Sequence, residues 1–479
     1  MSALDAAFAL ASPRLRPRPT GVAGYLIAGA VGGGTLLLLA SPFVSAGLLS
    51  WASGIAFILY DLLLLLFVAW QTLPLAVRRP PASPDETVTA DSRPSLTVII
   101  AAWNEAPVLE RTIAALTAQN DPPEHILIAD DGSTDDTALV LIRAYGFAPP
   151  TTATQHQTSP LHPRLAWLRV PHGGKARTLN RALAHIDTDI VVTVDADTHP
   201  AVDALAHMRQ AFAHDDQLVA ATGVLAPACK ASLGGRLLGT FQSCEYVRNF
   251  VSRYAWMRAD SLLLVSGAFA GYRRDALTAV GGFDPECLVE DYELIHRLHR
   301  HACAHGKTWR VRVVGQARAR TSAPSDLRAF LRQRRRWFAG FLQTQLWNRD
   351  MIGNRRFGKL GLLMLPVKTL DTVQPLLGLA ASATLLGLVA GGHLPLATAI
   401  LSVLLNKVLL DIVFHTWCLY LYRRWTAGEH APGYAQAIAT ALLEPFSFQI
   451  LRHLGAALGW HHFLTGRRSW GKQARHAMG

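Results

Sequence analysis

The sequence predicts an α/β domain with a mainly parallel sheet, placed between two groups of α-helical transmembrane segments. Long uncharged apolar stretches occur before residue 80 and return after residue 357. Between about 95 and 325, short β-rich runs alternate with helical stretches, which favours a doubly wound sheet. Acidic residues directly follow three of the expected strands, at the sheet edge where such folds bind ligands.

Composition limits the size of the cores, the classes of partner and the cysteine chemistry to be considered. The chain has 479 residues, of which 50% are hydrophobic, so it can bury more than one core. A net charge of +12 suggests anionic partners: nucleic acid, anionic lipid or a phosphorylated substrate. Nucleic acid is excluded as a partner because the basic residues lie beside apolar stretches and no helix-turn-helix or RNA-binding motif occurs. The five cysteines contain no C-x-x-C pair, which favours buried, reduced thiols over disulfides or zinc.

Residues 1–80 are expected to form a transmembrane hairpin, with spans at about 21–41 and 48–76. A cleaved signal peptide fits less well, because the first apolar stretch is too long and a second follows at once. The run Gly32-Gly33-Gly34 would suit close helix–helix contact. Arginines flank the hairpin and predict that both of its ends are cytoplasmic: Arg14, Arg16, Arg18, Arg78 and Arg79.

Residues 81–94 are polar and proline-rich and are expected to form a linker. The cytosolic domain then covers 95–325. Its expected strands are 96–102, 125–130, 165–170 and 189–197. Its expected helices are 108–119, one opening near 133, 176–186, and one from about 290.

Three acidic groups follow the expected strands: Asn104-Glu105, Asp130-Asp131, and Asp195 with Asp197. Each has a structural explanation, and Asp-Asp-Gly-Ser is also ordinary turn and helix-cap chemistry. Carboxylates gathered at one sheet edge repel each other, so a cation or a donor-rich ligand is expected there. The pair Asp195 and Asp197 suits Mg²⁺ or Mn²⁺ carrying a diphosphate.

Lys175 and Asp291 are further candidates. Two glycines precede Lys175 and the expected helix at 176–186, which would let a phosphate approach, although the Walker A spacing is absent. A plain turn with a solvated lysine fits equally well. Asp291 lies in the first turn of the helix from Glu290, where it could act as a general base or only complement the helix dipole.

After residue 325 the chain returns to the membrane. Residues 326–356 contain RQRRRW and are expected to form interfacial amphipathic helices. Residues 357–464 form a second transmembrane region with spans at 375–392 and 394–422. The stretch 434–460 forms either one further span or an interfacial pair, which gives two or three spans, and 465–479 is a basic cytosolic tail.

In this order, NE (104–105), DDGSTD (130–135), GGKARTLN (173–180), DAD (195–197), ED (290–291) and QRRRW (333–337) resemble the motifs of the processive, membrane-embedded family 2 glycosyltransferases. These include cellulose, chitin, hyaluronan and poly-N-acetylglucosamine synthases. The resemblance covers about 95–345 by motif and the flanking spans by layout. Ala101, Trp103 and Val289 depart from the residues usual in relatives, and Val289 weakens a cellulose assignment.

The resemblance implies a GT-A fold, a UDP-sugar donor and a hexosyltransferase activity. Asn104, Glu105, Asp130 and Asp131 would lie against the uridine side of the donor, and Lys175 near the nucleotide. Asp195 and Asp197 match the D-x-D positions that hold the nucleotide and the Mg²⁺ or Mn²⁺ cofactor. Asp291 matches the catalytic base, and Gln333, Arg336 and Trp337 match the Q-x-x-R-W signature.

Arg336 would contact the diphosphate, for which a guanidinium is well shaped, and Trp337 would offer a sugar of the acceptor an aromatic face. The neighbouring Arg328, Arg332, Arg334 and Arg335 are expected to form a polar face against anionic lipid. Because UDP leaves readily once its charge is neutralised, one base suffices, and a single displacement gives a β-linkage.

Polymerisation of UDP-N-acetylglucosamine, or else UDP-glucose, into an exopolysaccharide translocated across a bacterial inner membrane is the leading interpretation. Its partners would be the donor, a glycan or lipid acceptor, membrane lipids and accessory membrane or periplasmic subunits. The alternatives are single transfer to a ceramide- or polyprenyl-type lipid and a non-enzymatic scaffold. Polar groups that face inward between the spans would favour polymerisation, and six are candidates: Asp61, Asp371, Gln374, Lys407, Asp411 and Glu444.

Overall fold

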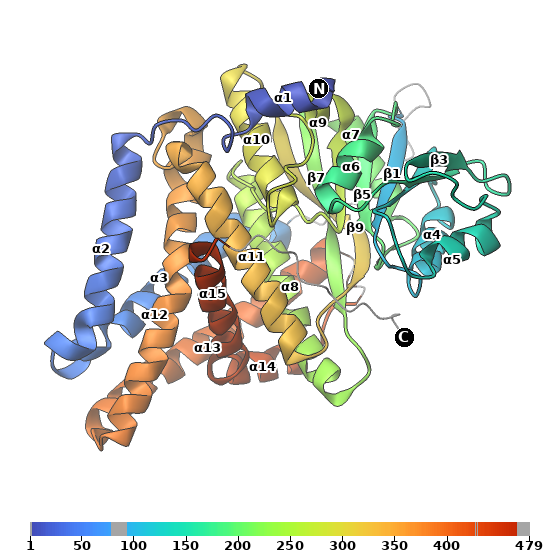
Figure 1. Cartoon of the computed structure of the whole chain (residues 1–479). Helices are drawn as coiled ribbons and strands as arrows, with labels where there is room; N and C mark the ends of the chain where they lie inside the picture. Colours follow the sequence, from blue (N-terminus) through green and yellow to red (C-terminus); the bar gives the residue numbers. More distant parts are fainter. Residues whose placement is uncertain (1, 78–92, 427, 429, 467–479) are drawn as a thin grey trace.

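The computed structural model describes residues 2–77, 93–426, 428 and 430–466. Most of the expected linker and basic tail lies outside these ranges. Long helices form one side of the molecule and the α/β domain forms the other, with α11 (Leu327–Trp347) running between them (Figure 1).

Among the described residues, four helical segments are long and apolar enough to cross a membrane. They are α2 (Val22–Val44), η1 with α3 (Gly47–Trp51 and Ala52–Val77), η5 with α12 (Leu360–Met364 and Leu365–Ala390), and α13 (Leu394–Trp425). The ambiguous stretch at 434–460 is divided into α14 (Tyr434–Leu443) and α15 (Phe448–Leu464) by η6 (Glu444–Phe446), which contains Pro445. Pro445 lacks an N–H donor and Ser447 has a non-helical backbone (φ −140°, ψ −87°), so the two helices are separate.

The glycine run in α2 does not make the close helix contact expected of it. A Cβ atom added at Gly32, Gly33 or Gly34 would meet no atom within 4 Å. These positions therefore face open space in the described structure, and the interpretation as a helix-packing motif is wrong.

The sheet has nine strands in the order β3-β4-β2-β1-β5-β8-β7-β9-β6. The strands β4 (Leu165–Arg169), β2 (His125–Asp130), β1 (Leu96–Ala102) and β5 (Ile190–Asp195) form its parallel centre. The strands β8 (Phe269–Arg273), β7 (Leu218–Ala228) and β9 (Arg310–Ser322) continue it, and β3 (Gln155–Thr158) and β6 (Thr198–Pro200) are its edges. This mixed, GT-A-like sheet confirms the predicted fold class.

Helices cover this sheet. The predicted ones are α4 (Leu109–Thr117), α5 (Thr137–Tyr145), α6 (Lys175–Leu183) and α10 (Glu290–Ala304). Four further helices were not predicted: α1 (Ala3–Ala11), α7 (Ala204–His214), α8 (Leu233–Arg258) and α9 (Arg274–Ala279). The remaining short turns are η3 (Arg349–Met351) and η4 (Arg355–Phe357).

The register of the central strands brings their carboxyl ends to one level. Ala102 of β1 pairs with Asp130 of β2, and Ala101 of β1 pairs with Asp195 of β5. Because these strands are parallel, the loops that follow them leave the sheet at the same edge. The acidic residues that end the strands are therefore neighbours, as the sequence predicts.

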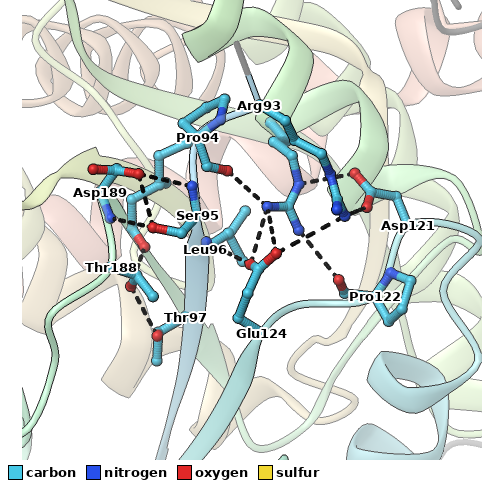
Figure 2. A network of polar contacts seen from close by, with 12 residues as sticks. Arg93, Pro94, Ser95, Leu96, Thr97, Asp121, Pro122, Glu124, Thr188 and Asp189 are labelled. Carbon is cyan, nitrogen blue, oxygen red and sulfur yellow. Dashed lines mark hydrogen bonds and ion pairs between the residues drawn. The ribbon is translucent and has the colours of Figure 1, made fainter. Parts of the chain in front are cut away.

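The opposite, amino edge is fastened by a polar network around the start of β1 (Figure 2). The buried Arg209 guanidinium of α7 donates to Asp121, to both oxygens of Glu124 and to the Pro94 carbonyl. Asp189, just before β5, accepts from the backbone N–H and hydroxyl of Ser95. This network fixes β1, β2 and β5 relative to one another at the edge opposite their carboxyl ends.

Helix α11 packs unusually closely against its neighbours. A Cβ added at Gly340 would lie 2.6 Å from a methyl of Val289, in the loop that precedes α10. On the other side, Cβ atoms at Gly455 and Gly459 of α15 would lie 2.5 Å from Arg334 and 2.7 Å from Phe338. Glycines thus let α11 fit between the α/β domain and α15, which fixes the position of the Q-x-x-R-W segment.

Candidate active site

The loops after β1 and β2 are tied together by Asn104. Its backbone has a φ of 58°, a left-handed conformation that asparagine tolerates better than most residues. The Asn104 side-chain oxygen accepts hydrogen bonds from the N–H groups of Thr134 at 2.8 Å and Asp135 at 3.2 Å. Glu105 follows and is buried, with its N–H donating to the Thr137 hydroxyl. Asn104 therefore holds the loops after β1 and β2 together.

Asp130 and Asp131 are both buried at the end of β2. Asp130 accepts from the Ser133 N–H at 2.8 Å and closes the turn. Asp131 accepts from the N–H groups of Gly173 at 2.8 Å and Gly174 at 2.9 Å, and from the Thr178 hydroxyl. A carboxylate in this place satisfies free donors at the start of α6 and also complements the helix dipole. Asp131 thereby fixes the loop that presents Lys175.

Lys175 lies at the centre of a charged cluster that it forms with Asp195, Glu290 and Asp291. Its Nζ lies 2.5 Å from Asp195 Oδ1 and 3.6 Å from Glu290 Oε1. Burial lowers the pKa of Lys175, but the charges of Asp195, Glu290 and Asp291 outweigh burial and raise it above the ordinary value. Lys175 is thus a permanent cation among three carboxylates, where the plain solvated lysine of the alternative interpretation does not fit.

Glu290 and Asp291 begin α10 beside this lysine. Burial and then the charge of Asp291 raise the pKa of Glu290, while Lys175 and Arg336 oppose the rise. The Asp291 carboxylate accepts from the Gly267 N–H at 2.7 Å and from the Tyr292 N–H at 2.8 Å. Two backbone donors hold the Asp291 side chain in one orientation, which a positioned base requires.

The Q-x-x-R-W residues lie on α11 and face different surroundings. Arg336 donates to the Leu288 carbonyl at 3.2 Å and is close enough to Glu290 to affect its pKa. Gln333 is buried, and its Oε1 accepts no hydrogen bond from any part of the chain that the structure describes. Trp337 points instead into a cavity on the membrane side. Consecutive residues of one helix therefore connect the charged cluster with that cavity.

The cavity has a volume of about 340 Å³ and lies between α3, α12 and α13 on one side and α8, α11 and α15 on the other. Trp337 and Phe341 form part of its wall. Five of the six intramembrane polar candidates also line it: Asp61, Gln374, Lys407, Asp411 and Glu444. The sixth, Asp371, accepts from Tyr60 and from Lys368 instead. Most of the polar groups in or beside the spans thus face inward.

A chain of ion pairs surrounds this cavity. Arg248 donates to both oxygens of Glu444 at 2.7 Å, and Arg452 bridges Glu444 and Glu245 at 3.1 and 3.2 Å. Arg334 pairs with Glu245 through two bonds of 2.9 and 2.6 Å. The prediction that Arg334 faces lipid is therefore wrong, because a buried carboxylate on α8 draws it inward. Arg328 and Arg332 are exposed.

The carboxylates at the end of β5 are the residues that could hold a divalent cation. Asp195 already binds a positive charge, the Lys175 ammonium, and Asp197 is two residues further on. No group of three or more acidic, histidine or cysteine side chains that could bind a metal by itself occurs among the described residues. Two carboxylates suit a Mg²⁺ or Mn²⁺ ion that takes its remaining oxygen ligands from a diphosphate and water.

Several residues of the site were missed from sequence. The Trp103 indole, in the loop after β1, stacks on the His172 imidazole, in the loop after β4, with ring centroids 4.7 Å apart. Glu290 was seen only as part of a motif, although it contacts Lys175. The spacing Gly455-x-x-x-Gly459 was an available signal for helix contact.

Residues 94–340, more than half of the chain, match the model of the family described as Glycosyltransferase like family 2. The chain belongs to glycosyltransferase family 2. This confirms the resemblance inferred from the motifs. A mannosyltransferase from Pyrobaculum calidifontis, solved in complex with GDP-Man and Mn²⁺, shares the fold with a TM-score of 0.55 and 24% identity. The likeness covers 83% of this glycosyltransferase and 99% of that chain.

Curated relatives include two poly-β-1,6-N-acetyl-D-glucosamine synthases. The one from Staphylococcus aureus (strain COL) is 27% identical over 255 residues, 53% of this glycosyltransferase and 56% of the relative. The one from Staphylococcus epidermidis is 25% identical over 280 residues, 58% of this chain and 61% of the relative. The glycosyltransferase therefore spans somewhat more than half the length of these relatives.

Proposed function

We propose that this family 2 glycosyltransferase polymerises a sugar from a UDP-sugar into a β-linked polysaccharide and passes the product into the membrane through its own helices. UDP-N-acetylglucosamine is the first candidate donor, in keeping with the named activity of the staphylococcal relatives, and UDP-glucose is the second. The catalytic domain would face the cytoplasm of a bacterium, with the hairpins in the inner membrane. Accessory membrane or periplasmic subunits would receive the chain.

The observation that carries this proposal is the connection between the charged cluster and the polar cavity. Arg336 donates to the carbonyl of Leu288, two residues before Glu290, whereas its neighbour Trp337 lines the cavity with polar groups from three candidate spans. An aromatic ring beside polar groups suits a sugar, which has an apolar ring face and hydroxyl edges. Ionisable groups within spans are costly and need a function, for which an aqueous path for a glycan gives a reason.

The reaction is a single displacement. Asp291 accepts the proton of the acceptor hydroxyl as that oxygen forms a bond to the anomeric carbon of the donor sugar. The bond from this carbon to the diphosphate oxygen breaks on the opposite face, and UDP takes the electron pair. Attack opposite the leaving group inverts the anomeric carbon, so an α-linked donor gives a β-linked product.

The negative charge that develops on UDP is stabilised by fixed cations. Lys175 is held by Asp195 and Glu290, and Arg336 is held by the Leu288 carbonyl just before Glu290. Such preorganised charges act most strongly on a leaving group whose charge grows in the transition state. Asp195 and Asp197 would hold the Mg²⁺ or Mn²⁺ ion, which supplies further neutralisation of the diphosphate. The buried Gln333 amide oxygen, which accepts no hydrogen bond from the described residues, would accept one from the donor sugar.

The experiment is a measurement of nucleotide release by the purified protein in nanodiscs with Mg²⁺ or Mn²⁺. UDP-N-acetylglucosamine, UDP-glucose, UDP-glucuronate and GDP-mannose are supplied one at a time, and Asp291→Asn is the control. Release from one UDP-sugar, lost in Asp291→Asn, supports the proposal. Release from GDP-mannose alone would refute the uridine donor. Release that needs added lipid and attaches one sugar per acceptor would refute polymerisation in favour of lipid glycosylation.

A further inference from the structure

The segment before the first span is folded onto the catalytic domain. Helix α1 begins with a capping box, in which Ser2 and Asp5 each accept the other's N–H. Figure 1 shows α1 beside α9 and α10, at the opposite end of the domain from α14. Pro13 and Ser12 after it are buried, whereas residues 15–19 are exposed as the chain leads to α2. Residues 2–14 therefore pack on the α/β domain, whereas residues 15–19 do not.

The surface that α1 covers is the start of the loop 281–289, which leads directly into Glu290 and Asp291. A Cβ at Gly281 would lie 2.2 Å from the backbone nitrogen of Phe8, so α1 rests on this glycine without a gap. The Phe8 ring lies under the Arg297 guanidinium, 5.1 Å from its centroid. Arg297 in turn donates to the carbonyls of Val280 and Gly282 at 2.6 and 2.7 Å. Helix α1 thus packs on Gly281 directly and contacts, through Phe8, the arginine that holds the start of the loop 281–289.

Arg14 joins this loop to helix α11. Its Nε and Nη2 donate to the two oxygens of Asp284, each at 3.0 Å, in a fork that matches the carboxylate. The Asp284 side chain is fully buried, while that of Arg14 is 26% exposed. The same guanidinium lies 5.8 Å from the ring centroid of Trp347, the last residue of α11. One side chain therefore holds the loop, the end of α11 and the N-terminal segment together.

The far end of the loop touches the charged cluster. Gln343 of α11 accepts from the Leu288 N–H and donates to the Glu286 carbonyl, at 3.1 Å each. Arg336 donates to the Leu288 carbonyl, two residues before Glu290. A shift of Asp284 would therefore displace Leu288, four residues further along the same loop. Arg336, which contacts Leu288, and Asp291, which follows it, would move as well.

We propose that residues 2–14 are a clamp that positions the loop 281–289, and that Arg14 is a positioning residue for Asp291. The proposal rests on the proposed function, in which Asp291 is the base. Arg14 touches no reacting atom and acts through Asp284 and Trp347. Its removal leaves the buried Asp284 carboxylate without its guanidinium partner, so the loop has to move to hydrate it.

The test compares Arg14→Ala with Arg16→Ala, a control that removes the same charge from an exposed position in the same segment. We expect kcat for UDP release to fall by about ten- to hundredfold in Arg14→Ala, because displacements near 1 Å have effects of this size. KM for the donor should change less than kcat, since Asn180 of α6, the helix that begins with Lys175, keeps its two hydrogen bonds to the Phe283 backbone. Arg14→Lys, which keeps the charge but not the fork, should restore part of the rate.

Hydrogen exchange of the 281–290 segment in the intact protein in nanodiscs provides a readout that does not depend on activity. Faster exchange in Arg14→Ala but not in Arg16→Ala supports the clamp, even if no donor tried is turned over and the proposed function fails. Equal exchange in the two variants, or wild-type kcat in Arg14→Ala, would overturn it. If Arg14→Ala does not fold, Phe8→Ala tests the same contact from α1, with the same expected and contrary results.

Discussion

Replacing Gly340 by alanine tests whether helix α11 fixes the loop 281–289, which leads into Asp291. The added Cβ would lie 2.6 and 2.8 Å from the two methyl carbons of Val289, the residue before Glu290. Ordinary carbon contacts begin near 3.4 Å, so Val289 or α11 must move by about 0.8 Å. Misplacement near 1 Å costs about 10²-fold in rate, so kcat in Gly340→Ala should fall roughly thirty- to hundredfold.

The stability of the same variant should fall by no more than about 2 kcal/mol, while the loss of rate corresponds to about 2–3 kcal/mol of activation free energy. Overpacking destabilises by about 1–3 kcal/mol, while alanine in place of a helical glycine recovers about 1 kcal/mol. The assay is UDP release with kcat and KM determined separately, together with thermal unfolding in detergent. Gly33→Ala in α2 is the matched control, because its Cβ meets nothing within 4 Å. A Gly340→Ala variant with wild-type kcat would refute the argument that α11 positions Asp291 through Val289.

Three further substitutions test the charged groups. Lys175→Met should lower kcat/KM for the donor by about 10²–10³-fold, measured by UDP release, because one fixed cation near the leaving group is lost. Glu290→Gln should raise the unfolding temperature at neutral pH, because burial raises the Glu290 pKa and its ionised form costs stability; the gain should vanish as pH falls toward about 4. Arg248→Met should destabilise by about 3 kcal/mol, since Glu444 then loses its bidentate partner and retains the Arg452 contact. Arg310→Met at an exposed pair should cost under about 1 kcal/mol by the same thermal unfolding measurement.

The parallel centre of the sheet could be predicted because each strand is a short apolar run that ends in a carboxylate. The predicted strand 96–102 matches β1, and 125–130 matches β2. Helix α10 begins at Glu290 as expected, because acidic residues in a first turn mark a helix start. These are local signals, so sequence was enough to find them.

The other half of the sheet was missed although part of its signal was present. In β9, arginines alternate with small apolar residues, and burial alternates along the strand in the same way. Helix α8 shows no such pattern, since it carries polar groups toward the cavity as well as toward the domain. Its pairing with α11, η6 and α15 could not be read from sequence, because Glu245, Arg334, Glu444 and Arg452 lie far apart in the chain.

The site shows the same division. The positions of Asp195 and Lys175 follow from a strand end and a helix start, whereas the contact of Glu290 with Lys175 was not predicted. The work of Asn104 and Asp131 in holding backbone loops could not be predicted, because a carboxylate or amide at a strand end fits a ligand and a turn equally well.

The central claim is that this glycosyltransferase builds a polymer by a single displacement. Its most direct test is the size and anomeric configuration of the product that the purified protein makes from the preferred UDP-sugar. Size-exclusion chromatography and the proton coupling of the anomeric position in NMR spectra give both quantities. We predict a β-linked polymer that lengthens with time and is absent with Asp291→Asn. An α-linked product would contradict a single displacement assisted by Asp291, and a single sugar on a lipid would contradict polymerisation.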